Sequence, residues 1–375
     1  MSLLIAAPVS TDNPISTRLY TANLTRGINQ KKIKASLFNL ENISEPIWLS
    51  KVFEILLRYI VYPLRIILGP EACIHITDSA YSFLVIPAHL AGKKTIVTLQ
   101  NRVEDIVSDT MLSRHEENML IPWLNKILFR FSINQLFKSN HIITVSQTIT
   151  DSLIHRGYPK NKITTSFMPI SDLFFSRLSA SDKKKVKKLK RGKNGSFWIF
   201  HPGNNDPGHK NVEHIFFCLQ ALLKRGYDVK FIKAGDPFNN RQLNLMKKLN
   251  IQSSVIHRGM CSQKILKLLY HASDVLLFPS FYEGCPAPPL EALVSGLPII
   301  VSGIPAHTSL LHSCAYFVDP DKPEESAKII ERLITHALSP SVLLAKGKKL
   351  VSGMRWKYAS IDTLRVYESL QHDGK

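Results

Sequence analysis

The sequence predicts two doubly wound α/β domains, and three observations support this prediction. The chain has 375 residues, which is more than one ordinary core needs and enough for two domains. Its composition, 45% hydrophobic and 21% charged, is typical of globular proteins. Short apolar runs alternate with helical patterns almost to the end of the chain, as in parallel sheets covered by helices on both faces.

The apolar runs between polar turns have the character of buried parallel strands. In the first half they are Leu3–Ala7, Ile74–Thr77, Thr95–Leu99, His141–Val145 and Ile163–Phe167. In the second half they are Phe197–His201, Asp228–Ala234, Val255–Arg258, Val275–Phe278, Pro298–Ser302 and Ala315–Val318. Helical patterns between the later strands are Asn211–Arg225, Ser262–His271 and Pro289–Ser295.

A change in composition marks the join between the domains. The segment Ser181–Ser196 carries eight Lys or Arg between Lys183 and Lys193 and almost no apolar residues. We therefore predict an N-terminal domain at 1–180, a basic linker at 181–195 and a C-terminal domain at 196–351. The linker is interpreted as a solvated helix and loop, with binding to an anionic membrane or substrate as the alternative.

The formal net charge of +19 predicts an anionic partner: nucleic acid, a phospholipid surface or a phosphorylated substrate. No Cys/His finger spacing, RNA-binding aromatic signature or heptad zipper accompanies the charge, so we do not expect a nucleic-acid partner.

Two segments of the first domain, Val52–Gly69 and Ile121–Lys138, are both basic and amphipathic. In the first, Arg58 and Arg65 lie off the apolar stripe and Pro63 should kink the helix. The stripe consists of Val52, Leu56, Ile60, Leu64 and Ile67. Packing in the core is the simpler interpretation. The alternative is an anionic membrane surface as a further partner, carrying a lipid-linked acceptor.

The cysteines and the N-terminus predict a cytoplasmic protein, peripheral on the inner face of the membrane if it meets one. The five cysteines are odd in number, far apart and without a CxxC pair, which favours neither a disulfide framework nor a zinc site. The opening MSLLIAAPVS has no basic region before its short apolar run, so it predicts a strand rather than a signal peptide. No run reaches the roughly 18 apolar residues of a spanning helix.

The segment Pro279–Ser302 is the strongest functional signal. It predicts a strand end, a tight turn, a helix starting near Pro288 and a second strand. Glu283 in the turn and Glu291 in the first helical turn can both face a ligand outside the carboxyl ends of the strands. Carboxylate oxygens accept hydrogen bonds from sugar or ribose hydroxyls, and the N–H groups that open the helix suit phosphates.

This segment resembles the E-x(7)-E signature of retaining glycosyltransferase family 4, including the run from Glu291-Ala292 to Gly296 and Pro298. The resemblance implies the GT-B fold, in which two Rossmann-like domains face each other across a cleft. It implies transfer of a sugar from a nucleotide-sugar to a carbohydrate or lipid-linked acceptor, with retention of configuration and without a metal or other cofactor. It also implies that Glu291 holds the ribose hydroxyls and Glu283 the donor sugar. Gly284 and Ala287 lie in the same donor-binding stretch.

A second block, His201–Ile215, is similar to the family's H-x-G-x-N-x-x-x-R/K-K-N loop. By this resemblance Gly203 allows close approach of the backbone, and Lys210 is the cation for the diphosphate leaving group. Many members place an arginine where this chain has Asn204, so neutralisation should rest on Lys210 with His209 nearby. Lys210 and Glu283 are therefore the candidate catalytic residues.

Further segments match in the expected order. His257–Ser280 resembles the strand and helix that lead into the E-x(7)-E turn, and it places Gly259 and Met260 near the base. Ser139–Ile163 resembles the end of the acceptor-side domain. Arg355–Leu370 resembles the closing helix, so residues 352–375 should cross back onto the N-terminal domain.

The first half departs from the family pattern. Thr11–Arg18 lacks the glycine pair that often follows the first strand, and Ser309 stands where relatives often have a glutamate. Gln100 and Asn101, the predicted acceptor-side residues, replace a His followed by Asp or Asn. Gln100 does not titrate, although it can bind a sugar through hydrogen bonds. Two alternatives therefore stay open: a catalytically idle GT-B protein that binds nucleotide sugar or a partner glycosyltransferase, and a GT-B epimerase or phosphorylase.

Overall fold

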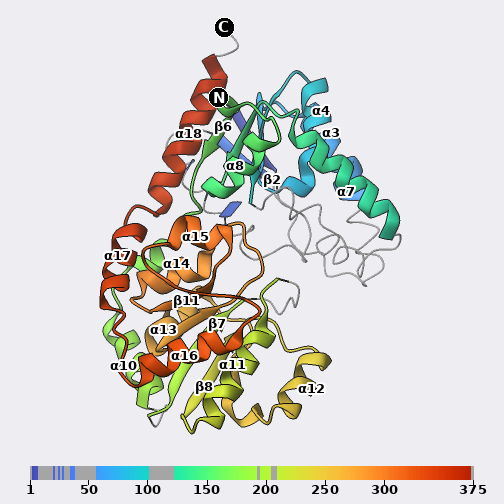
Figure 1. The fold of residues 1–375 in the computed structure, drawn as a ribbon. Coiled ribbons are helices and arrows are strands. Elements are labelled where there is room, and N and C mark those ends of the chain that lie inside the picture. The colour runs from blue at the N-terminus through green and yellow to red at the C-terminus, as the bar shows by residue number, and fades with distance from the viewer. Residues whose placement is uncertain are drawn as a thin grey trace. The chain divides into compact units, whose positions relative to one another are not determined.

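The computed structural model describes residues 2–6, 20–21, 24–25, 28, 34–38, 56–100, 122–191, 195–203 and 209–372. Contacts divide the chain into two units (Figure 1). Unit 1 is Met1–Pro169 together with Trp356–Lys375, and unit 2 is Ile170–Arg355. Each unit contains a six-stranded sheet in which all neighbouring strands are parallel. The predicted class of two doubly wound α/β domains is confirmed.

The sheet of unit 1 has the strand order β2-β1-β3-β4-β5-β6. Its strands are β1 Ser2–Ala6, β2 Lys34–Phe38, β3 Cys73–Ile76, β4 Lys94–Leu99, β5 His141–Thr144 and β6 Ile163–Thr165. All but β2 lie within two residues of the predicted runs. The prediction missed β2 because Lys34 and Ser36 interrupt its apolar residues, a composition that an edge strand tolerates.

Helices cover both sides of this sheet (Figure 1). They are η1 Leu57–Val61, α3 Tyr62–Leu68, η2 Ser79–Leu84, α4 Val85–Leu90, α7 Pro122–Leu136, α8 Gln147–His155, η3 Lys160–Lys162 and α18 Trp356–His372. The last of these, α18, packs Leu364 and Tyr367 against strand residues of unit 1, so the end of the chain returns to the N-terminal unit. The Tyr367 hydroxyl also lies 2.6 Å from Nδ1 of the buried His75.

The apolar stripe predicted for 52–69 faces solvent where it is described. Leu56, Ile60, Leu64 and Ile67 are 42–50% exposed, whereas Leu57, Tyr62 and Ile66 are buried. The interpretation of this stripe as core is therefore wrong. Leu56 is exposed before η1 begins, so the stripe lies on the outer face from the start of the helix. η1 is a π-helical turn in which the Tyr62 N–H donates to the Leu57 carbonyl, and it brings Leu57 and Tyr62, five residues apart, to the same buried side. Pro63 lies at the start of α3, where its missing N–H costs little.

The sheet of unit 2 has the order β12-β11-β10-β7-β8-β9. Its strands are β7 Phe197–Pro202, β8 Val229–Ala234, β9 Val255–His257, β10 Val275–Phe278, β11 Ile299–Ser302 and β12 Tyr316–Val318. Alternate residues enter different cores: Phe200 and Leu276 pack with α13 and α14, while Ile199 and Leu277 pack with α11 and α16. β7, β10 and β11 are thus buried on both faces, as their apolar runs predict.

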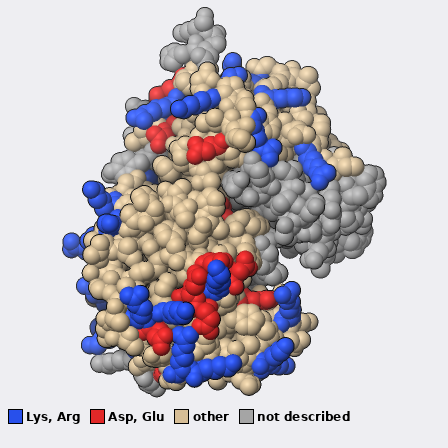
Figure 2. All heavy atoms as spheres, in the orientation of Figure 1, with Lys and Arg blue, Asp and Glu red and all other residues tan. Residues whose placement is uncertain are grey.

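The helices of unit 2 are α9 Asp172–Phe175, α10 Ala180–Arg191, α11 Val212–Lys224, α12 Asn240–Lys248, η4 Gln252–Ser254, α13 Gln263–Ala272, α14 Ala287–Val294, α15 Pro305–Leu311, α16 Pro323–Ile334 and α17 Ser341–Val351. On the face shown in Figure 2, acidic side chains gather over α11 and α16. There Arg225 pairs with Glu324 and Glu331 at 2.6 and 2.7 Å.

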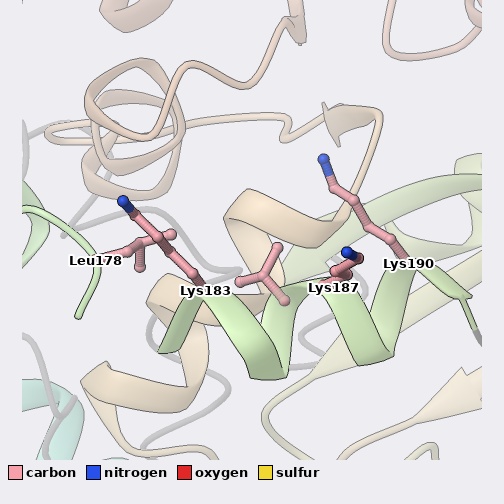
Figure 3. A pocket seen from close by; sticks show the side chains of 5 residues that line it. Leu178, Lys183, Lys187 and Lys190 are labelled. Atoms are coloured by element: carbon pink, nitrogen blue, oxygen red, sulfur yellow. The ribbon is translucent and has the colours of Figure 1, made fainter. Parts of the chain in front are cut away.

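The basic segment predicted as a linker is mostly the helix α10 of unit 2, and the contact boundary falls at 169/170 instead of 180/181. Val186 and Leu189 attach α10 to the unit 2 core, which explains why it is not a free linker. Its lysines at 183, 184, 185, 187, 188 and 190 are exposed. Lys183, Lys187 and Lys190 line a shallow hollow with Leu178 and Val186 (Figure 3).

Within the described ranges, no helix has the length and apolar character needed to cross a membrane. All five cysteines are free thiols, and Cys73, Cys218 and Cys314 are buried.

Candidate active site

The candidate site lies where the strand order of unit 2 reverses. β7 is the first strand of this unit, and its neighbours are β8 on one side and β10 on the other. Helices that follow β7 and β10 therefore cover opposite faces of the sheet, which leaves room beyond the carboxyl ends of the two strands. The loop with Lys210 follows β7, and the turn with Glu283 follows β10.

Lys210 and Glu283, predicted as the catalytic residues, form an ion pair. Lys210 Nζ lies 2.6 Å from Glu283 Oε1, and Nε2 of His209 lies 3.3 Å from the same oxygen. The side chains are only 12% and 6% exposed. Burial opposes ionisation of Glu283, but the charges of Lys210 and His209 outweigh it and hold the pKa of Glu283 well below its usual value. Glu283 is therefore ionised at neutral pH.

Backbone contacts keep the two loops in register. The Phe281 N–H donates to the His209 carbonyl at 2.8 Å, and the His209 and Tyr282 rings stack with centroids 4.2 Å apart. Asn211 adopts a left-handed conformation (φ 50°), and its Nδ2 donates to the carbonyls of Pro279 and Pro320. An asparagine suits this position because it tolerates positive φ and donates twice.

Glu291 lies on α14 in a different environment from Glu283. The helix begins at Ala287, so Glu291 falls in its second turn, one turn later than predicted. The carboxylate accepts a 2.8 Å hydrogen bond from the buried Tyr270 hydroxyl. Burial raises the pKa of Glu291 to about 7, although the Tyr270 bond opposes that rise. Near neutral pH this carboxyl is thus divided between its two protonation states.

The start of α14 does not offer the free N–H groups that the sequence suggested. Pro286, Pro288 and Pro289 have no N–H, Ala287 donates to the Cys285 carbonyl at 2.9 Å, and Leu290 donates to the Pro286 carbonyl. Gly284 is buried in the turn before the helix. The expectation of phosphate binding by these N–H groups is wrong because prolines occupy the positions that would supply them.

Three neighbouring strands each end near a glycine with positive φ. Gly203 (φ 140°), Gly235 (φ 113°) and Gly259 (φ 65°) follow β7, β8 and β9. Gly203 N–H donates to Ala234, and Gly235 N–H donates to Gly259, both at 2.9 Å. Glycine adopts a positive φ without strain, and because it has no Cβ the ends of the three strands can approach each other closely. Met260, beside Gly259, is 60% exposed.

Two buried histidines join the site, although the sequence interpretation gave them no role. Nδ1 of His201 lies 3.0 Å from the Leu277 carbonyl oxygen. Nδ1 of His307 lies 2.9 Å from the Ser302 carbonyl oxygen. Burial lowers the pKa of His201 to about 3 and of His307 to about 4, so both rings are neutral. Because a carbonyl only accepts, Nδ1 carries the proton and Nε2 is left as an acceptor.

Neither Nε2 atom has a hydrogen-bond partner in the part of the chain that the structure describes. Both rings lie close enough to Lys210 and Glu283 for charges to interact. Two buried acceptors without partners suit the hydroxyls of a sugar. His201 is the first residue of the H-x-G motif, so the sequence could have indicated that it lies in the site.

The remaining predicted residues lie elsewhere. Gln100 follows β4 in unit 1, and its Nε2 donates to the Thr77 carbonyl at 3.2 Å. Asn101 and Asn204 lie outside the described residues. Among the described residues, no group of three or more His, Cys, Asp or Glu side chains could hold a metal ion.

Comparison with known proteins agrees with this geometry. Residues 183–349 match the family model described as Glycosyl transferases group 1. The chain is 27% identical over 249 residues to the O-antigen chain mannosyltransferase RfbU of Salmonella typhimurium. It is 26% identical over 195 residues to the N,N'-diacetylbacillosaminyl-diphospho-undecaprenol alpha-1,3-N-acetylgalactosaminyltransferase of Campylobacter jejuni. These alignments cover 64% and 47% of this chain and 66% and 46% of the relatives, so they span less than two thirds of either relative.

Among solved structures, Anabaena Alr3699/HepE in complex with UDP and glucose has a TM-score of 0.74 with this chain. The alignment covers 99% of this chain and 100% of that one at 15% identity, which supports a common fold.

Proposed function

We propose that the protein transfers a hexose from a nucleotide-sugar donor with retention of configuration, because residues 183–349 match the family model of glycosyl transferases group 1 and the chain has the GT-B fold that the sequence resemblance implied. The observation that carries the proposal is the buried Lys210–Glu283 pair at the reversal point of the unit 2 sheet. A cation placed there can stabilise a departing diphosphate, and carboxylate and imidazole acceptors can bind sugar hydroxyls.

In the proposed reaction, the bond between the sugar C1 and the phosphate oxygen breaks, and its electron pair remains on the nucleoside diphosphate. The acceptor hydroxyl oxygen forms the new bond on the same face of the sugar, and its proton passes to the departing phosphate oxygen. This route needs no protein nucleophile. Lys210 stabilises the developing negative charge, Glu283 holds the donor sugar and Glu291 the ribose.

Hydrolysis of a donor panel without acceptor tests the proposal, since water replaces the unknown acceptor. We expect slow release of nucleoside diphosphate from one donor in the wild type. In Lys210→Ala, the kcat of this release should fall about 100-fold, with a smaller change in KM, because the lysine charge matters most as the diphosphate departs. Lys224→Ala, which removes an exposed lysine at the end of α11, is the matched control.

The outcomes separate this function from its alternatives. Donor binding without any turnover, with acceptor extracts also present, would favour the catalytically idle GT-B protein. An altered free sugar nucleotide would favour an epimerase. The anomeric configuration of the product, measured by NMR, tests retention, and activity after chelation tests the expectation that no metal is required.

For the acceptor, we propose a carbohydrate or lipid-linked glycan of polysaccharide or glycolipid biosynthesis, reached at an anionic membrane surface. The names of the Salmonella and Campylobacter relatives support a glycan and a diphospho-undecaprenol acceptor. Six exposed lysines on α10 and the exposed apolar stripe of η1 and α3 support attraction to anionic lipid and shallow insertion.

A further inference from the structure

Lys233 lies at the carboxyl end of β8, and its side chain is fully buried. Its Nζ donates to the Gly203 carbonyl and, at 3.0 Å, to the Ala234 carbonyl. The Gly203 carbonyl belongs to the residue that follows β7 and begins the loop leading to Lys210. Lys233 thus ties the strand end that carries the candidate phosphate loop to the neighbouring strand.

Burying the Lys233 ammonium group costs desolvation free energy, which its hydrogen bonds to two carbonyls only partly offset. Desolvation opposes its charge and lowers the pKa of Lys233 to about 8. The Lys210 charge lowers this pKa further, whereas Asp236 and the Cys261 thiol raise it. No ion pair joins Lys233 to a carboxylate within the described ranges. An apolar side chain at position 233 would avoid this cost, so a buried positive charge there suggests a function for the charge.

The number of positive charges available to a bound diphosphate suggests what this function is. Lys210 is already paired with Glu283, and the residues at 204–208 include no Lys or Arg. The start of α14 offers no free N–H to phosphate. A nucleoside diphosphate brings at least two negative charges, so a further cation must meet it in a site of low dielectric.

We propose that Lys233 is a positioning residue of the diphosphate subsite: it fixes the Gly203 carbonyl and supplies the second positive charge beside Lys210. Acting through Gly203, it need not touch the ligand. This inference rests on the proposed nucleotide-sugar function. It predicts that Lys233 contributes to the affinity for phosphate but not to the affinity for the nucleoside.

Two variants separate the charge from the hydrogen bond. Lys233→Met removes both, while Lys233→Gln keeps an N–H donor for the Gly203 carbonyl. Lys230→Met is the matched control, since Lys230 lies on the same strand, on the opposite face, with Nζ donating to the Ser253 carbonyl. The ligands are the nucleoside diphosphate that stabilises the wild type most in a thermal screen and the matching nucleoside.

We expect both Lys233 variants to bind the diphosphate about 10- to 100-fold more weakly, while the nucleoside Kd changes less than about twofold. Lys230→Met should bind both ligands as the wild type does. Diphosphate affinity that survives in Lys233→Gln would overturn the role of the charge, and equal losses for nucleoside and diphosphate would reduce Lys233 to a structural support. If the wild type binds no nucleoside diphosphate, it is the proposed function that fails.

The pH dependence of the wild type gives a readout that needs no variant to fold. Diphosphate affinity should fall as the pH rises from about 7.5 to 9.5, where the phosphate is fully ionised and Lys233 loses its proton. Lys233→Gln should lack this decline. A flat wild-type profile over this range would contradict the proposal.

Discussion

Glu283 and Glu291 are chemically identical side chains that the fold places in opposite electrostatic settings. Glu283 stays ionised beside Lys210 and His209, whereas Glu291 accepts a hydrogen bond from the neutral Tyr270 hydroxyl, and its pKa lies at about 7. Two carboxyls whose environments separate their pKa values in this way are suited to different tasks. A permanent anion suits the charged loop, and a titrating one suits neutral ribose hydroxyls.

The pKa of Glu291 leads to a pH-dependence prediction. Because its folded-state pKa is raised, the carboxyl is largely protonated below about pH 7, and in the proposed ribose-binding role it would accept hydroxyls fully only above that pH. Affinity for the nucleoside should therefore rise about tenfold between pH 6 and pH 8, following the ionised fraction. Calorimetry with the nucleoside, which has no phosphate to titrate, measures this directly.

The control for this prediction is Glu291→Gln, which should bind the nucleoside weakly and without a pH trend, while Glu283→Gln should keep the trend. If the wild-type affinity is constant across this range and Glu291→Gln binds the nucleoside equally well, Glu291 does not belong to the ribose site.

At the scale of the element, strands such as β7, β10 and β11 were predictable because each is an apolar run buried on both faces, whereas β2, which contains Lys34 and Ser36, was not. β10 Val275–Phe278 matches its prediction at both ends. Features set by backbone hydrogen bonding were not predictable. The π turn at Leu57–Val61 depends on which carbonyl each N–H selects, and the burial of Lys233 depends on a carbonyl from a different strand. The hydrophobic periodicity of the sequence reveals neither the π turn nor the burial of Lys233.

The close approach of β7 and β8 makes Gly235 a sensitive position. A Cβ added there would collide with the Gly203 carbonyl oxygen, so Gly235→Ala must displace the strand end as well as adopt a positive φ. We expect the unfolding temperature to fall by roughly 8 °C or more and nucleoside diphosphate binding to be lost.

Gly226→Ala measures the cost of placing alanine at a positive φ without a steric collision. Gly226 also has a positive φ (83°), but a Cβ there would meet nothing within 4 Å. Its unfolding temperature should fall by only about 2–4 °C, with ligand binding intact. Equal effects of the two substitutions in differential scanning fluorimetry would show that the Gly203 contact is unimportant.

For the whole molecule, the large positive charge is unevenly arranged. Acidic side chains gather over α11 and α16, whereas α10 carries six exposed lysines with Asp182 as its acidic residue (Figure 2). Net charge alone would attract any polyanion, but a basic helix in one unit and an apolar stripe in the other are specific features that can be tested separately.

Co-sedimentation with vesicles tests the membrane proposal. We expect binding to vesicles with anionic lipid, weak binding to neutral ones and release at high salt, since each lysine near the surface contributes about 1 kcal/mol. Replacing Lys183, Lys187 and Lys190 by Gln should weaken binding strongly. Replacing the exposed Lys346, Lys348 and Lys349 of α17 by Gln removes the same charge and should have a smaller effect.

A variant with Leu64→Ser and Ile67→Ser tests the stripe in the same assay and should lose binding that resists salt. If the wild type remains in the supernatant with anionic vesicles at low salt, the acceptor is better sought among water-soluble glycans.

The π turn also bears on how this segment can change over evolution. Successive residues of a helix are about 100° apart around its axis. Deleting one residue within Leu57–Val61 would let the turn close with α-helical spacing, and Tyr62 and Ile66 would stay on the buried side, because a π turn already holds one extra residue. The same deletion within α3 has no extra residue to remove and would rotate every later side chain by about 100°. The π turn is therefore a place where this helix can lose one residue while the apolar stripe keeps facing solvent.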